Sequence, residues 1–197
     1  MSEMKNGEII KVAGPVVKAR NMRGARMYDV VRVGKENLIG EIVELHGDHA
    51  NIQVYEDTVG IGPGEEVVNT GAPLSVELGP GLISSIYDGI QRPLDQLSQQ
   101  QGDFIKRGSA IPGLRRDVKW KFEATMQAGG NVSTGDILGQ GQESTLLLHK
   151  IMVPPGFSGK LEWLNAGEYT VEEVIGVVAQ EDGSKYELKL MQRWPVR

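Results

Sequence analysis

Hydrophobic and polar residues alternate with a period of two along most of the chain. The stretch DVKWKFEATM is the clearest case. Its apolar residues Val118, Trp120, Phe122, Ala124 and Met126 fall on one face, and its charged and hydroxyl residues fall on the other. This pattern predicts a half-buried β-strand.

Three further stretches repeat the alternation. We expect their inward-facing residues to be Ala50, Ile52 and Val54, then Leu74, Val76 and Leu78, and then Tyr186, Leu188 and Leu190. Turn-forming sequences separate such runs: Gly34-Lys35-Glu36-Asn37, Gly47-Asp48, Gly62-Pro63-Gly64, Gly129-Gly130-Asn131 and Asp182-Gly183-Ser184. Their spacing is typical of antiparallel sandwiches and barrels. The chain is therefore predicted to be all-β, with closed or nearly closed sheets that leave few free edges.

One segment has a different pattern. In QRPLDQLSQQQGDF, Pro93 stands near a possible first helical turn, Leu94 and Leu97 have helical spacing, and Gly102 is a stop signal. We expect one short helix over residues 91–101. Because it lies between two β-rich regions, the stretch 79–113 is predicted to be a structured connector.

Composition narrows the class of protein. The chain has 197 residues, of which 40% are hydrophobic and 24% charged, so one or two domains are expected. A formal charge of −5 disfavours nucleic acid as a partner. Cysteine is absent, which excludes disulfides and thiolate chemistry. No apolar run approaches the roughly 18 residues of a membrane span, so we expect a cytoplasmic protein that contacts a membrane only indirectly.

The glycine-rich stretch VPPGFSGKLEW raises the question of phosphate binding. A P-loop needs four residues between its first glycine and the Gly-Lys-Ser/Thr, so that backbone N–H groups wrap the phosphates. Here Gly156 and Gly159 are too close together, and Leu161 follows Lys160 where a hydroxyl is required. This loop is therefore not interpreted as a phosphate site.

Other candidate chemistry is equally sparse. His46, Asp48 and His49 in LHGDH have side chains that can hold Zn²⁺ or Fe²⁺, but Gly47-Asp48 also has the composition of a tight hairpin turn, which would make these side chains diverge. His149 lies in an apolar run and is interpreted as a partnered or edge histidine.

Nucleophile and carboxylate signatures are also missing. Gly108-Ser109 lacks the context of a nucleophile elbow, and adjacent Glu172 and Glu173 would face opposite sides of a strand. No catalytic, cofactor-binding or metal-ligating residue is assigned.

The carboxyl-terminal part resembles the barrel-sandwich hybrid fold of biotinyl and lipoyl carrier domains. The resemblance rests on GGNVSTGDILGQ, the Pro-Gly-x-x-Gly turn, KLEWL and GEYTVEEVIGVV. In those carriers a lysine at a hairpin tip bears the cofactor. Here the tip is Pro155-Gly156-Phe157-Ser158, and Lys160 stands past it at the start of a strand. A stand-alone binding or carrier module of this type, without the modified-lysine motif, is one functional alternative.

A second resemblance covers nearly the whole chain. GEIIKVAGPVVKAR, LIGEIVELHGDHANIQVYEDTVGIGPGEEV, the specific block GPGLISSIYDGIQRPLD and the final WPVR are similar to the catalytic A subunit of archaeal-type and vacuolar-type rotary ATP synthases. GDFIKRG and IMVPPGFSGKLEWLNAGEYTVEEVIGVV resemble the insertion that distinguishes this subunit from its non-catalytic partner.

The resemblance implies a domain organisation. Residues 1–71 would form the amino-terminal crown barrel, 72–116 a connector with the short helix, 117–184 the projecting bulge domain, and 185–197 a return strand towards a nucleotide-binding domain. In the family the P-loop follows WPVR. The hypothesis is therefore a non-catalytic amino-terminal portion, inert towards ATP by itself, of a subunit that uses Mg-ATP and couples ATP synthesis or hydrolysis to proton or sodium ion transport.

The same resemblance implies partners. B subunits of the ring and peripheral-stalk proteins are expected, on a complex peripheral to the cell membrane. At the tip of the bulge hairpin, Pro155 and Phe157 are candidate contacts; the alternative is that Phe157 folds back onto its own barrel.

Overall fold

The computed structural model describes residues 6–83, 85–102 and 105–196. The chain divides into two compact units. The first consists of Met1–Val76, Gln96–Ile111 and Pro195–Arg197, and the second of Glu77–Asp95 and Pro112–Trp194.

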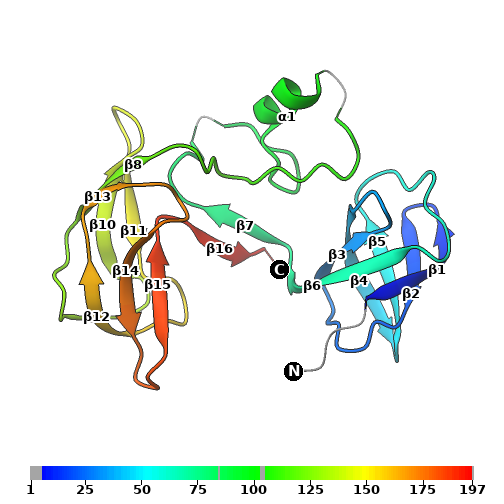
Figure 1. Cartoon of the computed structure of the whole chain (residues 1–197), viewed down its shortest axis with the longest axis horizontal. Helices are drawn as coiled ribbons and strands as arrows, with labels where there is room; N and C mark the ends of the chain where they lie inside the picture. Colours follow the sequence, from blue (N-terminus) through cyan, green and yellow to red (C-terminus); the bar gives the residue numbers. More distant parts are fainter. Residues whose placement is uncertain (1–5, 84, 103–104, 197) are drawn as a thin grey trace. The chain divides into compact units, whose positions relative to one another are not determined.

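The first unit is built around a closed six-stranded barrel, blue to cyan in Figure 1. Its strands are β1 (Gly7–Ala13), β2 (Val16–Arg20), β3 (Asp29–Val33), β4 (Leu38–His46), β5 (His49–Val54) and β6 (Glu66–Pro73). They pair antiparallel in the order β1-β2-β5-β4-β3-β6, and β6 pairs back to β1. Every barrel strand therefore has a partner on both sides.

Alternation along the strands builds the barrel core. Ala50, Ile52 and Val54 of β5 are buried, as expected from the sequence. The core comprises these residues together with Ile9, Val17, Ala19, Met22, Val31, Val33, Leu38, Ile42 and Val67. At the end of β4, Gly47 has a φ of 63°, which allows the two-residue loop that pairs His46 with His49.

The described residues contain one helix, α1 (Leu94–Gln101). It begins at Leu94 and not at Gln91, because Gln91 has a left-handed φ of 61° and Pro93 forms a bridge with Tyr87. Leu97 is buried, and Gly102 ends the helix with a φ of 76°.

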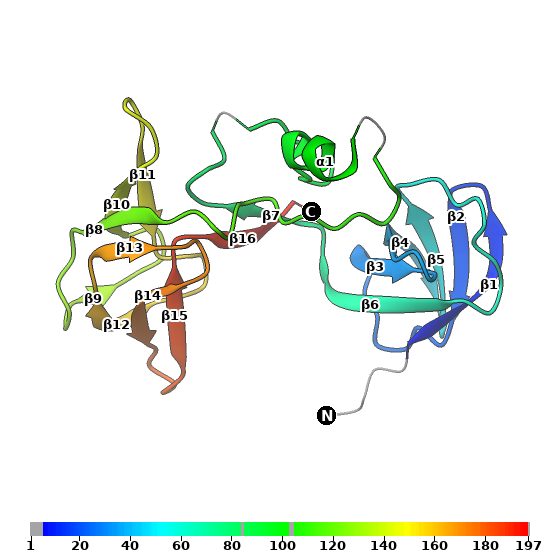
Figure 2. The same cartoon turned by 45° about the horizontal axis from the view of Figure 1, so that its top comes forward.

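The second unit contains two four-stranded antiparallel sheets (Figure 2). One has the order β11 (Leu148–Met152), β10 (Ile137–Gln142), β8 (Trp120–Ala124), β13 (Gly167–Tyr169). The other has the order β15 (Lys185–Lys189), β14 (Val174–Ala179), β12 (Gly159–Leu164), β9 (Asn131–Val132). Their shared core consists of Phe122, Val132, Leu138, Ile151, Val153, Leu161, Ile175, Val178, Leu188 and Leu190.

Two of the predicted alternations supply this core. Phe122 is buried and Trp120, Ala124 and Met126 pack against the core; Leu188 and Leu190 are buried and Tyr186 packs against it. The all-β fold class is confirmed, and of the sheets in the described residues the six-stranded barrel is the closed one.

One predicted alternation is wrong. β7 (Ser75–Leu78) forms a two-stranded sheet with β16 (Gln192–Pro195). Leu74, Val76 and Leu78 were expected inward, but the buried residue of this strand is Glu77, and Leu78 is exposed. The phase is reversed because Glu77 is bound by arginines from distant parts of the chain.

Candidate functional site

Glu77 stands on β7, where the chain enters the second unit. Its side chain is 11% exposed. Oε1 accepts hydrogen bonds from Nη2 of Arg116 at 2.6 Å and from Nη2 of Arg193 at 3.0 Å, and Oε2 accepts one from the Leu114 amide at 3.2 Å. Because Arg193 belongs to β16, one carboxylate ties together the strands on which the chain enters and leaves this unit. We call Glu77, Gln91, Leu114, Arg116 and Arg193 the Glu77 junction.

The side-chain amide of Gln91 serves as a short substitute for a neighbouring strand. The Glu77 amide donates to Gln91 Oε1 at 2.6 Å, and Gln91 Nε2 donates to the Glu77 carbonyl at 2.7 Å. Gly113 lies against this amide, because a Cβ there would come within 2.7 Å of Gln91 Cδ. The backbone of Glu77 is therefore fixed as firmly as its carboxylate.

The electrostatics of the Glu77 junction favour the charged forms. Burial alone would raise the pKa of Glu77, but hydrogen bonds from Arg116, the Leu114 amide and Arg193 outweigh it and lower the pKa. Burial likewise acts to lower the pKa of Arg116, and contacts with Glu77 and Glu172 raise it overall. The junction is thus a buried ion pair whose polar atoms are satisfied by hydrogen bonds.

A second buried carboxylate, Glu143, follows β10. Its side chain is only 4% exposed. Oε1 accepts hydrogen bonds from the amides of Gly81 at 2.8 Å and Ile83 at 3.1 Å, and Oε2 lies 3.3 Å from Nδ1 of His149. His149 is on β11, an edge strand, so its interpretation as a partnered or edge histidine is confirmed on both counts.

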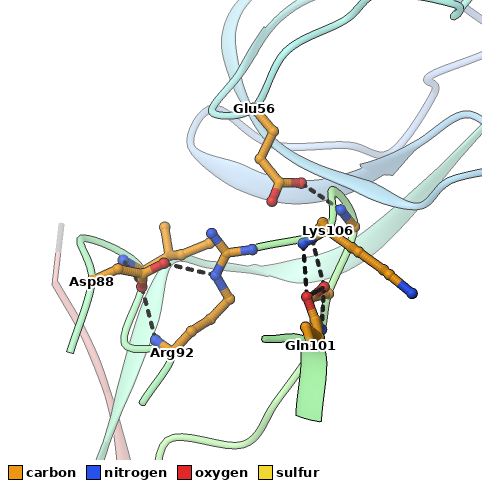
Figure 3. A network of polar contacts seen from close by, with 8 residues as sticks. Glu56, Asp88, Arg92, Gln101 and Lys106 are labelled. Atoms are coloured by element: carbon orange, nitrogen blue, oxygen red, sulfur yellow. Dashed lines mark hydrogen bonds and ion pairs between the residues drawn. The ribbon is translucent and has the colours of Figure 1, made fainter. Parts of the chain in front are cut away.

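The connector also contains a self-contained polar turn. Asp88 Oδ1 accepts hydrogen bonds from the amides of Ile90 at 3.1 Å and Arg92 at 2.8 Å, and the Arg92 side chain folds back to Oδ2 at 2.7 Å (Figure 3). Burial acts to raise the pKa of Asp88, but these donors lower it overall. The turn is therefore held by a carboxylate that stays ionised.

In the first unit, the loop after α1 is fastened to the barrel. Figure 3 shows the Glu56 carboxylate directed at this loop, where it accepts a hydrogen bond from the Gly108 amide at 2.8 Å. Gln101 Oε1 accepts another from the Lys106 amide at 2.7 Å. Ser109 Oγ donates to the Lys106 carbonyl at 2.5 Å. Gly108-Ser109 is therefore part of a turn, consistent with the missing elbow context.

Arg107 completes this attachment. Nη1 donates to the carbonyls of Asp57 at 3.0 Å and Val59 at 2.6 Å, and Nη2 donates to Glu36 Oε1 at 3.0 Å. A Cβ on Gly108 would stand 1.8 Å from the Glu36 carbonyl oxygen, so only glycine fits beside the barrel turn. The GDFIKRG sequence thus includes a clamp on two barrel loops.

The hairpin tip of the second unit settles one open alternative. Phe157 stacks on Tyr186 with ring centroids 3.7 Å apart, so it folds back onto its own domain. Pro155 is exposed at the tip. Lys160 is exposed within β12, where it pairs with Ala179 and Asn131, and so does not stand at the tip.

The two histidines of the LHGDH turn each pair with a different carboxylate. His46 Nε2 lies 2.7 Å from Glu44, and His49 Nδ1 lies 2.8 Å from Asp48. Within residues 6–83, 85–102 and 105–196, no group of three or more His, Cys, Asp or Glu residues is arranged to hold a metal ion.

The two adjacent glutamates diverge, but for a different reason than expected. They lie in the turn before β14 and not in a strand. Glu172 pairs with Nε of Arg116 at 2.9 Å, whereas Glu173 accepts a hydrogen bond from the Thr170 amide at 2.5 Å.

Among the described residues, no helix is long and apolar enough to cross a membrane.

Two family models match the two β-rich regions. Residues 9–71 match the β-barrel domain of the ATP synthase alpha/beta family, and residues 111–197 match the barrel-sandwich domain of the ATP synthase alpha/beta subunit. The chain belongs to the ATP synthase alpha/beta family. The family predicted from the sequence is confirmed.

Relatives within the family match nearly the whole chain. The V-type ATP synthase alpha chain 1 of Clostridium tetani is 55% identical over 195 residues, which cover 99% of this chain and 33% of the relative. The A subunit of the A-type ATP synthase from Pyrococcus horikoshii is 57% identical over 192 residues, covering 97% of this chain and 20% of the relative. The V-type ATP synthase alpha chain of Acetivibrio thermocellus is 52% identical over 194 residues, covering 98% and 33%. The chain therefore spans a third or less of the length of these relatives.

Sequence reasoning missed both the Glu77 junction and Glu143. Glu77 is separated from its arginine partners by 39 and 116 residues, so no local window contains them together. One signal was available: a lone glutamate inside an apolar strand, combined with Arg115-Arg116 shortly after Gly113, indicates a buried ion pair.

Proposed function

We propose that this chain forms the non-catalytic amino-terminal portion of an A subunit of an A/V-type ATP synthase. The proposal rests on the match of both β domains to the family, together with relatives 52 to 57% identical over nearly the whole chain. The whole subunit would couple ATP synthesis or hydrolysis to the transport of protons or sodium ions.

The parts would divide this work as the resemblance implies. Residues 1–71 are proposed as the crown barrel, 72–116 as the connector, 117–184 as the bulge domain and 185–197 as the return strand. The barrel would provide a rigid rim for neighbouring B subunits, since all its strands are paired. The bulge domain would provide a second surface, for peripheral-stalk proteins, on a cytoplasmic complex peripheral to the membrane.

Mg-ATP chemistry is assigned to the part of the relatives' length that this chain does not span. Both Gly-Lys pairs of the sequence, Gly34-Lys35 and Gly159-Lys160, lack a following hydroxyl residue. Lys35 and Lys160 therefore do not provide the phosphate-binding and Mg²⁺-binding pattern of a P-loop.

A domain exchange tests the assembly function. The matching 195 residues of the Clostridium tetani relative are replaced by this chain, and the chimaeric polypeptide is co-expressed with its B subunit. We expect a purified ring with Mg-ATP hydrolysis close to that of the unmodified complex. A chimaera that folds but fails to enter the ring would contradict the proposal. The matched control carries Lys119→Ala, a change at an exposed position.

Two measurements on the isolated chain sharpen the test. Purified protein incubated with Mg-ATP is expected to release no phosphate above background, and specific release would overturn the non-catalytic assignment. The carrier alternative predicts a cofactor-sized mass addition on Lys160 after co-expression with a biotin or lipoate ligase. We expect the unmodified mass, because Lys160 is held within β12.

A further inference from the structure

The segment that follows β7 packs against the rest of the second unit, which we call the barrel-sandwich unit. A Cβ at Gly79 would stand 2.9 Å from Leu114 Cδ1 and 3.2 Å from the Leu190 carbonyl oxygen. A Cβ at Gly81 would stand 3.1 Å from Trp120 Cζ2, and the φ of Gly81 is +101°. Close backbone contact therefore occurs at alternate positions. We call residues 79–83 the strap.

Glu143 supplies the polar attachment of the strap. Its Oε1 accepts both the Gly81 and the Ile83 amide hydrogen bonds, and these are the third and fifth positions of the strap. The loop that carries Glu143 is itself closed, because its amide donates to the Leu147 carbonyl at 3.0 Å. Burying a charged carboxylate is unfavourable unless donors meet it, so the two strap amides stabilise Glu143 through Oε1, whereas Oε2 has no hydrogen-bond partner among the described residues and lies 3.3 Å from His149 Nδ1.

The base and the body of the loop that contains the strap are attached by different bonds. At the base of the loop, Gln91 is bonded to the backbone of Glu77. In its body, the strap amides of Gly81 and Ile83 are bonded to a side chain and not to a strand, so no β-ladder secures them. Beyond these bonds, the side chains of Ile83 and Ile86 are 60% and 71% exposed. Ile86 is held separately, because its carbonyl oxygen accepts a hydrogen bond from the Leu94 amide at 2.9 Å. The position of the Ile83 side chain therefore depends on how firmly the strap is held.

We propose that Glu143 is a latch, and that the strap detaches from the barrel-sandwich unit as one piece when this carboxylate is removed, while both sheets and the base of the loop stay intact. The latch is a conformational device of this chain, and it does not depend on the function proposed above. Glu143 acts as a positioning residue, since it sets the place of Ile83.

Hydrogen exchange on the whole chain tests the latch. Glu143→Ala removes the acceptor of two charge-assisted hydrogen bonds, so we expect the Gly81 and Ile83 amides to exchange at least about tenfold faster. Glu143→Gln keeps an acceptor oxygen but not the charge, and should give an intermediate rate. Glu123→Ala is the matched control, because Glu123 is an exposed carboxylate of β8 in the sheet next to this loop.

The peptides that do not change are as informative as those that do. Exchange in β8, β10 and at Gln91 should match that of the unmodified protein in the Glu143 variants. Unchanged strap exchange in Glu143→Ala would overturn the proposal, because the strap would then be held by its glycine contacts alone. Faster exchange throughout both sheets in Glu143→Gln would also overturn it, because Glu143 would then be a general stability residue. If Glu143→Ala does not fold, the Glu143→Gln comparison decides.

Discussion

In the barrel, buried carboxylates bind side chains of adjacent strands. Asp29 of β3 accepts a hydrogen bond from Asn69 of β6 at 3.0 Å, and Glu41 of β4 accepts one from Tyr55, just after β5, at 2.7 Å. In the barrel-sandwich unit, the hydrogen bonds that Glu77 and Glu143 accept come instead from segments outside the two four-stranded sheets. Carboxylates of similar burial thus serve different structural purposes in the two units.

The difference follows from how each unit closes. The barrel closes through backbone pairing around its whole circumference, so apolar alternation is enough to define it. The second unit must also hold segments that lie outside its two four-stranded sheets. Charge-assisted hydrogen bonds that Glu77 and Glu143 accept and that Arg116 donates do this. The barrel should therefore be most sensitive to lost volume, and the Glu77 junction to lost charge.

The largest effect is expected in the barrel core. Ile52 is completely buried, so Ile52→Ala should lower the free energy of unfolding by about 2 to 5 kcal/mol through lost burial and the cavity left behind. The three tryptophans all lie in the second unit and do not report on the barrel. The unfolding of the barrel is therefore measured by the amide exchange of β4 and β5 during guanidinium denaturation. Val59→Ala, at a side chain that is 69% exposed, should change the free energy of unfolding of the barrel by less than about 0.5 kcal/mol. Equal effects of the two variants would contradict this explanation of the core.

A smaller but still large effect is expected at the Glu77 junction. Glu77→Ala leaves Arg116 partly buried without its main partner, and we expect a loss of about 3 kcal/mol in the unfolding free energy of the second unit. Tryptophan fluorescence during denaturation reports this unit. Glu181→Ala, at an exposed turn position, is the control. A loss below about 1 kcal/mol would place the junction among ordinary surface ion pairs.

The same contrast explains what could be predicted from the sequence. The strands around Ile52, Phe122 and Leu188 followed from local alternation, and the turn at Gly47 from local composition. For β7 the local pattern chose the wrong face, because the apolar Leu78 is less buried than Glu77. What decided the phase was a charge partner 116 residues away, and no period within a strand records such a contact.

The predicted helix shows the same limit at smaller scale. Its end at Gln101 followed from Gly102, but Gln91 was assigned to the helix. The side chain of Gln91 instead forms hydrogen bonds with the Glu77 backbone, and the left-handed φ of Gln91 excludes this residue from the first helical turn. The long-range contact again overrode local propensity.

Lowering the pH should weaken the junction by less than removing Glu77 does. The pKa of Glu77 in the folded chain lies below its usual 4.5. Its contribution to stability is therefore fully present above the unfolded-state pKa and is lost as the pH falls through the folded-state pKa. We expect the stability difference between the unmodified chain and Glu77→Gln to stay constant from about pH 7 down to about pH 5, and to shrink below that range. A difference that grows on acidification would contradict the assignment of Glu77 as the charged partner.

The smallest effect is expected at the hairpin tip. Phe157→Leu keeps an apolar side chain but removes the ring stacked on Tyr186, so the free energy of unfolding should fall by about 1 kcal/mol. A double-mutant cycle with Tyr186→Leu, followed by tryptophan fluorescence, should give a coupling of about 0.5 to 1.5 kcal/mol between the rings. Pro155→Ala at the exposed tip is the control and should have little effect, because its side chain is not part of the stack. Zero coupling would mean that the tip holds Phe157 away from its own domain in solution, which would restore Phe157 as a candidate contact for a partner.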